Sequence, residues 1–73
     1  MYKINHQYLD RFSKRRYEYL YPVTKGIYIA FDSESLEYIG IELFYLPYTN
    51  SYEKQANALL NNLFTKGILE FID

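Results

Sequence analysis

The strongest periodic signal in the chain lies between Asn50 and Lys66. Apolar residues recur there at helical spacing and form one arc: Tyr52, Ala56, Leu59, Leu60, Leu63 and Phe64. Asn50 is a residue type favoured at helix N-caps, and Glu53 three residues later completes the pattern of a capping box. Gly67 marks the end, because glycine readily adopts the left-handed conformation that terminates many helices. The pattern predicts an amphipathic helix that packs on a core.

The middle of the chain alternates with a period of two, which is typical of β-strands. Two such segments, residues 26–32 and 36–46, flank the polar residues 32–35 and predict an antiparallel β-hairpin. Pro47 ends the second segment, because proline has no N–H to donate to a neighbouring strand. After the helix, residues 68–72 are β-prone and are interpreted as a possible short final strand.

Residues 1–25 carry two competing signals. One is a broad helical arc formed by four residues: Tyr8, Leu9, Phe12 and Tyr19. The other is a period of two, which a turn at residues 24–26 would fold back onto the next strand: Tyr17, Tyr19, Tyr21 and Val23. We expect an N-terminal helix up to about Arg16, followed by extended chain into Pro22.

These elements predict a small α+β fold in a single domain, residues 1–73. The expected order is an N-terminal helix, an antiparallel β-hairpin, a packing helix and the possible final strand. A chain of this length buries only about 60% of its unfolded surface, and it has no cysteine for a disulfide or a thiolate zinc site. Stability must therefore come from a dense apolar core or from burial against a second chain.

The two faces of the predicted hairpin differ. Alternation places one set of large apolar residues toward the helix: Ile27, Ile29, Phe31, Ile39, Ile41 and Leu43. The other set is aromatic and small where a solvated face would be polar: Tyr28, Ala30, Tyr38, Gly40, Glu42 and Phe44. Either the N-terminal helix covers this second face, or it is an apolar patch that meets another protein. The protein-binding residues predicted on this basis are Tyr28, Tyr38, Glu42 and Phe44.

The net charge is only −1, but it is distributed unevenly. Residues 1–25 contain six basic and two acidic residues, whereas residues 26–73 contain two basic and seven acidic ones. Opposite charges of this kind can attract each other within a small fold. The one basic cluster holds the candidate nucleic-acid-binding residues Arg11, Lys14, Arg15 and Arg16. Cations also stabilise a helix C-terminus, and an acidic hairpin disfavours phosphate, so we expect no general binding of nucleic acid.

Candidate catalytic residues are few. His6 is the only histidine, and the absence of cysteine excludes a Cys–His pair. Glu37 and Glu42 would point to opposite faces of one strand, so they could not act on the same substrate. The chain has no glycine-rich phosphate loop. We therefore expect no catalytic residues, no cofactor and no metal site.

The sequence favours a small inhibitor or regulator that occupies a surface of a partner protein. Regulators of this size without cysteine are common among phage and mobile-element genes. Two alternatives remain open: a DNA- or RNA-binding regulator that uses residues 11–16, and a structural subunit that forms a homodimer or larger homo-oligomer. The first residues lack the apolar segment of a signal peptide, and no apolar run reaches the roughly 18 residues of a membrane span. We expect a cytoplasmic protein that does not enter membranes.

Overall fold

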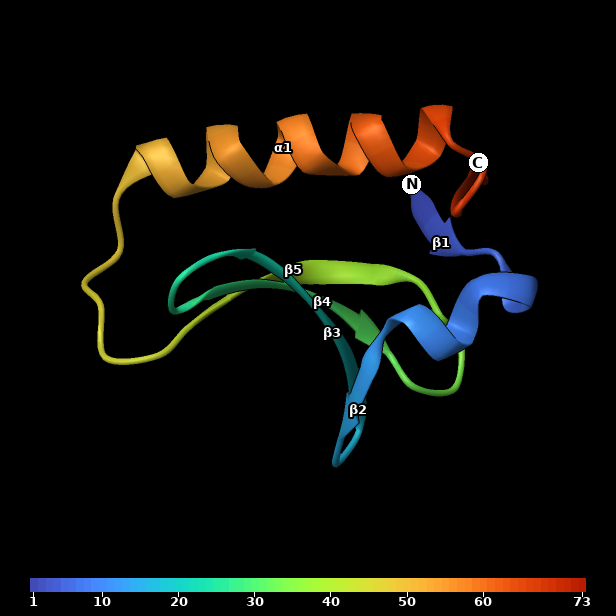
Figure 1. Ribbon diagram of the computed structural model, residues 1–73, viewed down its shortest axis with the longest axis horizontal. Helices are drawn as coiled ribbons and strands as arrows, with labels where there is room; N and C mark the ends of the chain where they lie inside the picture. Colours follow the sequence, from blue (N-terminus) through green and yellow to red (C-terminus); the bar gives the residue numbers. More distant parts are fainter.

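The computed structural model describes residues 1–73 and contains an antiparallel sheet with a single α-helix across one of its faces (Figure 1). Four strands form this sheet in the order β2-β3-β4-β5. Their bounds are Ser13–Arg15 for β2, Glu18–Thr24 for β3, Ile27–Asp32 for β4 and Tyr38–Leu43 for β5. The helix α1 spans Asn50–Thr65, close to the predicted range.

Two short strands join the ends of the chain. β1 (Tyr2–Ile4) pairs antiparallel with β6 (Leu69–Phe71), which is the final strand expected after the helix. A single bridge between Lys3 and Glu37 connects β1 to the chain just before β5. Figure 1 shows both chain ends beside the C-terminal end of α1. No helix in the structure is long and apolar enough to cross a lipid bilayer.

The N-terminal helix expected up to about Arg16 is absent, so the predicted order of elements is wrong. Only His6–Arg11 turns, as a 3₁₀ segment (η1) that is capped by the Asn5 side chain. Beyond it the chain is extended, and β2 turns back through Arg16 to pair with β3. The alternating pattern of residues 17–23 dominates over the helical arc, because aromatic and β-branched side chains pack well on a pleated sheet.

The main core lies between α1 and the sheet face that carries Ile29 and Phe31. Nine buried residues form it: Ile4, Phe12, Ile29, Phe31, Ala56, Leu60, Leu63, Ile68 and Leu69. The ring centroids of Phe12 and Phe31 lie 5.4 Å apart in an edge-to-face arrangement, which is favourable for aromatic pairs. The N-terminal segment therefore packs into the same core as α1 and leaves the opposite face of the sheet without a covering helix.

An irregularity in β5 changes which side chains face the helix. Ala30 pairs with Gly40 but Phe31 pairs with Tyr38, so Ile39 is an extra, bulged residue. The Ile39 side chain is 57% exposed, whereas the Tyr38 ring turns to the core and lies 5.6 Å from the Phe31 ring. The strict alternation expected over this strand is therefore wrong at Tyr38 and Ile39. Gly40 has a φ of +147°, a backbone conformation that permits the bulge.

The helix ends as predicted but begins differently. The Ile68 N–H donates to the Leu63 carbonyl oxygen at 2.9 Å, and Gly67 has a φ of +80°, which together form a Schellman motif. At the other end Thr49 is the N-cap residue, and its side chain makes no capping hydrogen bond. Asn50 is already the first helical residue, so the predicted capping box is absent.

Candidate functional site

The sheet face opposite α1, called here the outer face, is concave. The residues that alternation places on it include Glu18, Leu20, Tyr28, Ala30, Gly40, Glu42 and Phe44. The guanidinium carbon of Arg15, on β2, lies 4.7 Å from the centroid of the Phe44 ring, which follows β5. In a flat sheet the two residues would be about 14 Å apart across the strands. They would also be far apart along the strands, because Arg15 is level with Asp32 whereas Phe44 follows Leu43, which is level with Ile27. The β2–β3 hairpin bends away from the plane of the other strands (Figure 1), and Leu20 and Ala30 are buried without a helix above them.

Two carboxyl groups meet on this face. Glu18 projects from β3 and Glu42 from β5. Burial, and then a hydrogen bond and negative charge from Glu42, raise the pKa of the Glu18 carboxyl, while the Arg15 charge partly offsets the rise. The two groups lie close enough to repel each other when both are ionised.

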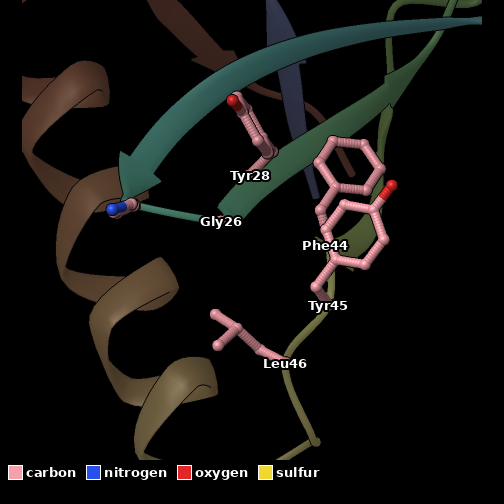
Figure 2. A pocket seen from close by; sticks show the side chains of 6 residues that line it. Gly26, Tyr28, Phe44, Tyr45 and Leu46 are labelled. Carbon is pink, nitrogen blue, oxygen red and sulfur yellow. The ribbon is translucent and has the colours of Figure 1, made fainter.

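A hollow of about 430 Å³ opens beside the outer face, where β5 runs into the loop before α1 (Figure 2). Six residues line it: Lys25, Gly26, Tyr28, Phe44, Tyr45 and Leu46. The Tyr28 and Phe44 ring centroids are 5.3 Å apart. Figure 2 shows Tyr28, Phe44, Tyr45 and Leu46 arranged around the opening. The walls are therefore mainly apolar and aromatic, as in many ligand-binding clefts.

Gly26 sets the shape of the hollow at the β3–β4 turn. Its φ is +81°, and its carbonyl oxygen accepts a hydrogen bond from the Phe44 N–H at 2.9 Å. A Cβ atom at this position would lie 2.9 Å from Leu46 Cδ1 and 3.2 Å from the Phe44 carbonyl oxygen. Only glycine therefore combines this backbone conformation with the close approach of the loop.

Tyr45 is the most unusual residue of the hollow. Its φ is +63°, and its side chain is fully exposed. The left-handed conformation costs a residue with a Cβ roughly 1–2 kcal/mol, and Tyr45 recovers none of this by burial. The same loop exposes Leu46 and Tyr48, although connecting segments are usually polar. An exposed aromatic residue on a strained backbone is typical of a binding site.

The structure brings together three of the four predicted protein-binding residues. Tyr28 and Phe44 are in contact, and Glu42 is the cross-strand partner of Tyr28 on the same face. Tyr38 is not part of this group, because the bulge turns it to the opposite face against Phe31.

Four lining residues were not among those predicted from the sequence: Lys25, Gly26, Tyr45 and Leu46. The available signal was the composition of residues 44–48, Phe-Tyr-Leu-Pro-Tyr. A strand-to-helix connection this apolar is unusual, because exposed connecting segments normally carry polar residues. Residues 44–46 were instead expected to lie in the strand that Pro47 ends, whereas β5 ends at Leu43.

The four basic candidates do not form one patch. Arg11 lies 5.0 Å from the centroid of the Tyr8 ring, and Arg15 lies over Phe44. Lys14 and Arg15 are neighbours on β2 and so point to opposite faces. Arg16 is at the β2–β3 turn with a φ of +55°. The N-terminal helix that was expected to carry these side chains is absent.

The surroundings of the basic turn are acidic. The Ser33 N–H donates to the Tyr17 carbonyl oxygen at 2.9 Å, which holds the β4–β5 turn against the β2–β3 turn. The Asp32 side chain accepts hydrogen bonds from the N–H groups of Glu34 and Ser35 at 2.8 and 2.9 Å, and these two bonds hold the pKa of Asp32 below its ordinary value. Part of the positive N-terminal charge thus lies beside negative charge from the second half of the chain.

No three histidine, cysteine, aspartate or glutamate side chains lie together in a way that could hold a metal ion. Comparison of the chain with protein-family models, with curated proteins and with solved structures finds no match.

Proposed function

We propose that this protein is a binding module that inhibits or regulates another protein by covering part of its surface. The hollow bounded by Tyr28, Phe44, Tyr45 and Leu46 is the proposed contact site. One observation carries the proposal: Tyr45 is fully exposed on a left-handed backbone from which the isolated chain gains no packing. A partner that buries the Tyr45 ring would provide the missing stabilisation.

The composition of the site supports a protein partner. Tyrosine combines a large apolar area with a polar tip, and it is enriched among the residues that dominate protein–protein binding energy. Tyr45 and Tyr48 project from the loop while the hollow beside them recedes, so the site offers both an anchor and a pocket. We place its action in a reducing compartment such as the cytoplasm, because the 73 residues include no cysteine.

The test compares two exposed tyrosines. Tyr17 is 82% exposed at the β2–β3 turn and does not line the hollow, so Tyr17→Ala is a matched control for Tyr45→Ala. The partner is captured from the native host with the wild-type chain as bait, then purified and titrated against both variants. We expect Tyr45→Ala to weaken binding by about 1–3 kcal/mol and Tyr17→Ala to leave it unchanged.

Circular dichroism is the folding control, and sedimentation measures self-association. If every captured protein binds Tyr45→Ala as tightly as the wild type, the proposed site is wrong. If the chain instead forms a dimer that Tyr45→Ala dissociates, the occupant of the hollow is a second copy and the function is that of a homo-oligomeric subunit.

A further inference from the structure

We infer that the hollow binds an acidic segment of the partner protein, in which a large apolar side chain stands next to a carboxylate. This inference rests on the proposed function and names the chemistry of the partner. It starts from charge: Lys25 is the only charged residue among the six that line the hollow. The four hydrophobic lining residues, Tyr28, Phe44, Tyr45 and Leu46, supply an apolar surface for the side chain of the partner.

The Lys25 ammonium group is free to bind. Lys25 is exposed, and its side chain takes part in none of the side-chain hydrogen bonds of the structure. A carboxylate from a partner would form a charge-assisted hydrogen bond there, which is roughly twice as strong as a neutral one. The adjacent apolar walls would exclude water around that bond and strengthen it further.

The other charges near the hollow determine where the carboxylate lies. Arg15 covers the Phe44 ring from the β2 side, but the Glu18 and Glu42 carboxyl groups share that part of the outer face. They would repel an incoming carboxylate at the Arg15 end. The acidic group of the partner is therefore placed at the Lys25 end, and its apolar side chain lies between Tyr28 and Leu46.

The same charges disfavour a second copy as the occupant. The loop that a second copy would insert, residues 44–48, contains no carboxylate to pair with Lys25. A twofold contact centred on the hollow would bring the Lys25 side chains of the two copies toward each other. An acidic foreign segment can pair a carboxylate with the Lys25 ammonium group, whereas another copy of this loop cannot.

A displayed library of random short peptides tests the inference. The library is selected on the immobilised wild-type chain and counter-selected on Tyr45→Ala, so that the recovered peptides depend on the hollow. Each recovered peptide is then titrated against Lys25→Glu and against Lys54→Glu, an exposed lysine on α1 that serves as the matched control. We expect peptides with aspartate or glutamate beside leucine, phenylalanine or tryptophan. Their affinity should fall about tenfold or more in Lys25→Glu and stay unchanged in Lys54→Glu.

The outcomes separate the inference from the proposed function. Peptides that need Tyr45 but are neutral or basic, and that bind Lys25→Glu as well as the wild type, would overturn the acidic partner while leaving the binding site in place. Recovery of no peptide that depends on Tyr45 would overturn both.

Discussion

Three non-glycine residues have positive φ, and each stands in a different relation to the fold: Arg16, Leu36 and Tyr45. Arg16 lies in the tight turn of the β2–β3 hairpin, where positive φ matches the twist of the strands. Leu36 is half-buried and packs against the main core, so its contacts offset the strain. Arg16 is exposed as well, but of the three only Tyr45 is a large hydrophobic residue that combines strain with full exposure. At the scale of single residues, the strained and exposed Tyr45 is the observation on which the proposed function depends.

Replacing Tyr45 with glycine should therefore stabilise the isolated protein. The substitution relieves roughly 1–2 kcal/mol of left-handed strain and adds about 0.5–1 kcal/mol of glycine entropy, so we expect a net gain of about 0.5–1 kcal/mol. Urea unfolding followed by circular dichroism measures it. The matched control is Leu36→Gly, which relieves similar strain but loses core packing and should be destabilising. A loss of stability in Tyr45→Gly would mean that its ring makes a contact in the isolated chain.

The raised pKa of the Glu18 carboxyl predicts that the stability of the protein depends on pH. Because its pKa is raised above the ordinary 4.5, the folded state binds this proton more tightly than the unfolded chain does. The stabilisation that comes from this proton is fully present below pH 4.5. It is lost as the pH rises through the raised pKa of Glu18 in the folded state. Glu42→Gln removes the neighbouring charge and should increase the free energy of unfolding at pH 7 by up to about 1 kcal/mol.

The free energy of unfolding, measured by chemical denaturation between pH 4 and pH 8, checks the predicted direction of this effect. The gain from Glu42→Gln should shrink toward pH 4, where the wild-type Glu18 is already protonated. Glu34→Gln, at the exposed β4–β5 turn, is the control and should show no such trend. A gain that is equal at both ends of the range would show that the effect of Glu42→Gln is not electrostatic.

Among the elements, α1 contributes Ala56, Leu60 and Leu63 to the main core. Leu60 and Leu63 are 1% and 2% exposed and belong to the main core. Leu60→Ala or Leu63→Ala should each reduce the free energy of unfolding by roughly 2–5 kcal/mol, as for other buried leucines. Chemical unfolding measures the loss, and Asn57→Ala on the exposed side of α1 should change stability by less than about 0.5 kcal/mol. A loss below about 1 kcal/mol at either leucine would contradict the packing described.

Elements with a strong local signal were predictable, and those that depend on distant pairing were not. The α1 helix combines an apolar arc with a terminating glycine, Gly67, and both features can be recognised within a short stretch of sequence. The N-terminal residues carry two patterns of similar strength, and only pairing with β4 selects the extended one. The β1–β6 pair joins opposite ends of the chain, so no local pattern could reveal its partner.

The candidate site was half predictable for a related reason. Alternation runs without interruption from Gly40 through Glu42 to Phe44, so Phe44 was placed correctly on the face of Tyr28. A bulge shifts every residue on its far side to the other face, and Tyr38 lies on that side. The position of the bulge depends on how β5 pairs with β4, so it cannot be predicted from the alternation of residues along the sequence alone.

At the scale of the whole molecule, the two faces of the four-stranded sheet are covered in different ways. The α1 helix covers the inner face, and the curvature of the β2–β3 hairpin buries Leu20 and Ala30 on the outer face. The chain has no second α-helix with which to cover the rest. The hollow is what remains open at the end of β5 farthest from the β4–β5 turn, and the apolar loop borders it. A fold that covers its sheet incompletely thus leaves an open apolar surface, which is the proposed contact site.

The distribution of charge over the whole molecule predicts that the chain does not bind nucleic acid generally. Phosphate binding needs several cations on one surface, and affinity rises with their number. Here Arg11 and Arg15 lie on aromatic rings, Lys14 points to the opposite face from Arg15, and Arg16 stands beside the acidic β4–β5 turn. Mobility shifts with duplex and single-stranded probes at low salt should therefore show no stable complex. The variant Arg15→Glu plus Arg16→Glu should behave like the wild type, and a tight wild-type complex that this variant abolishes would make the basic segment, not the hollow, the functional surface.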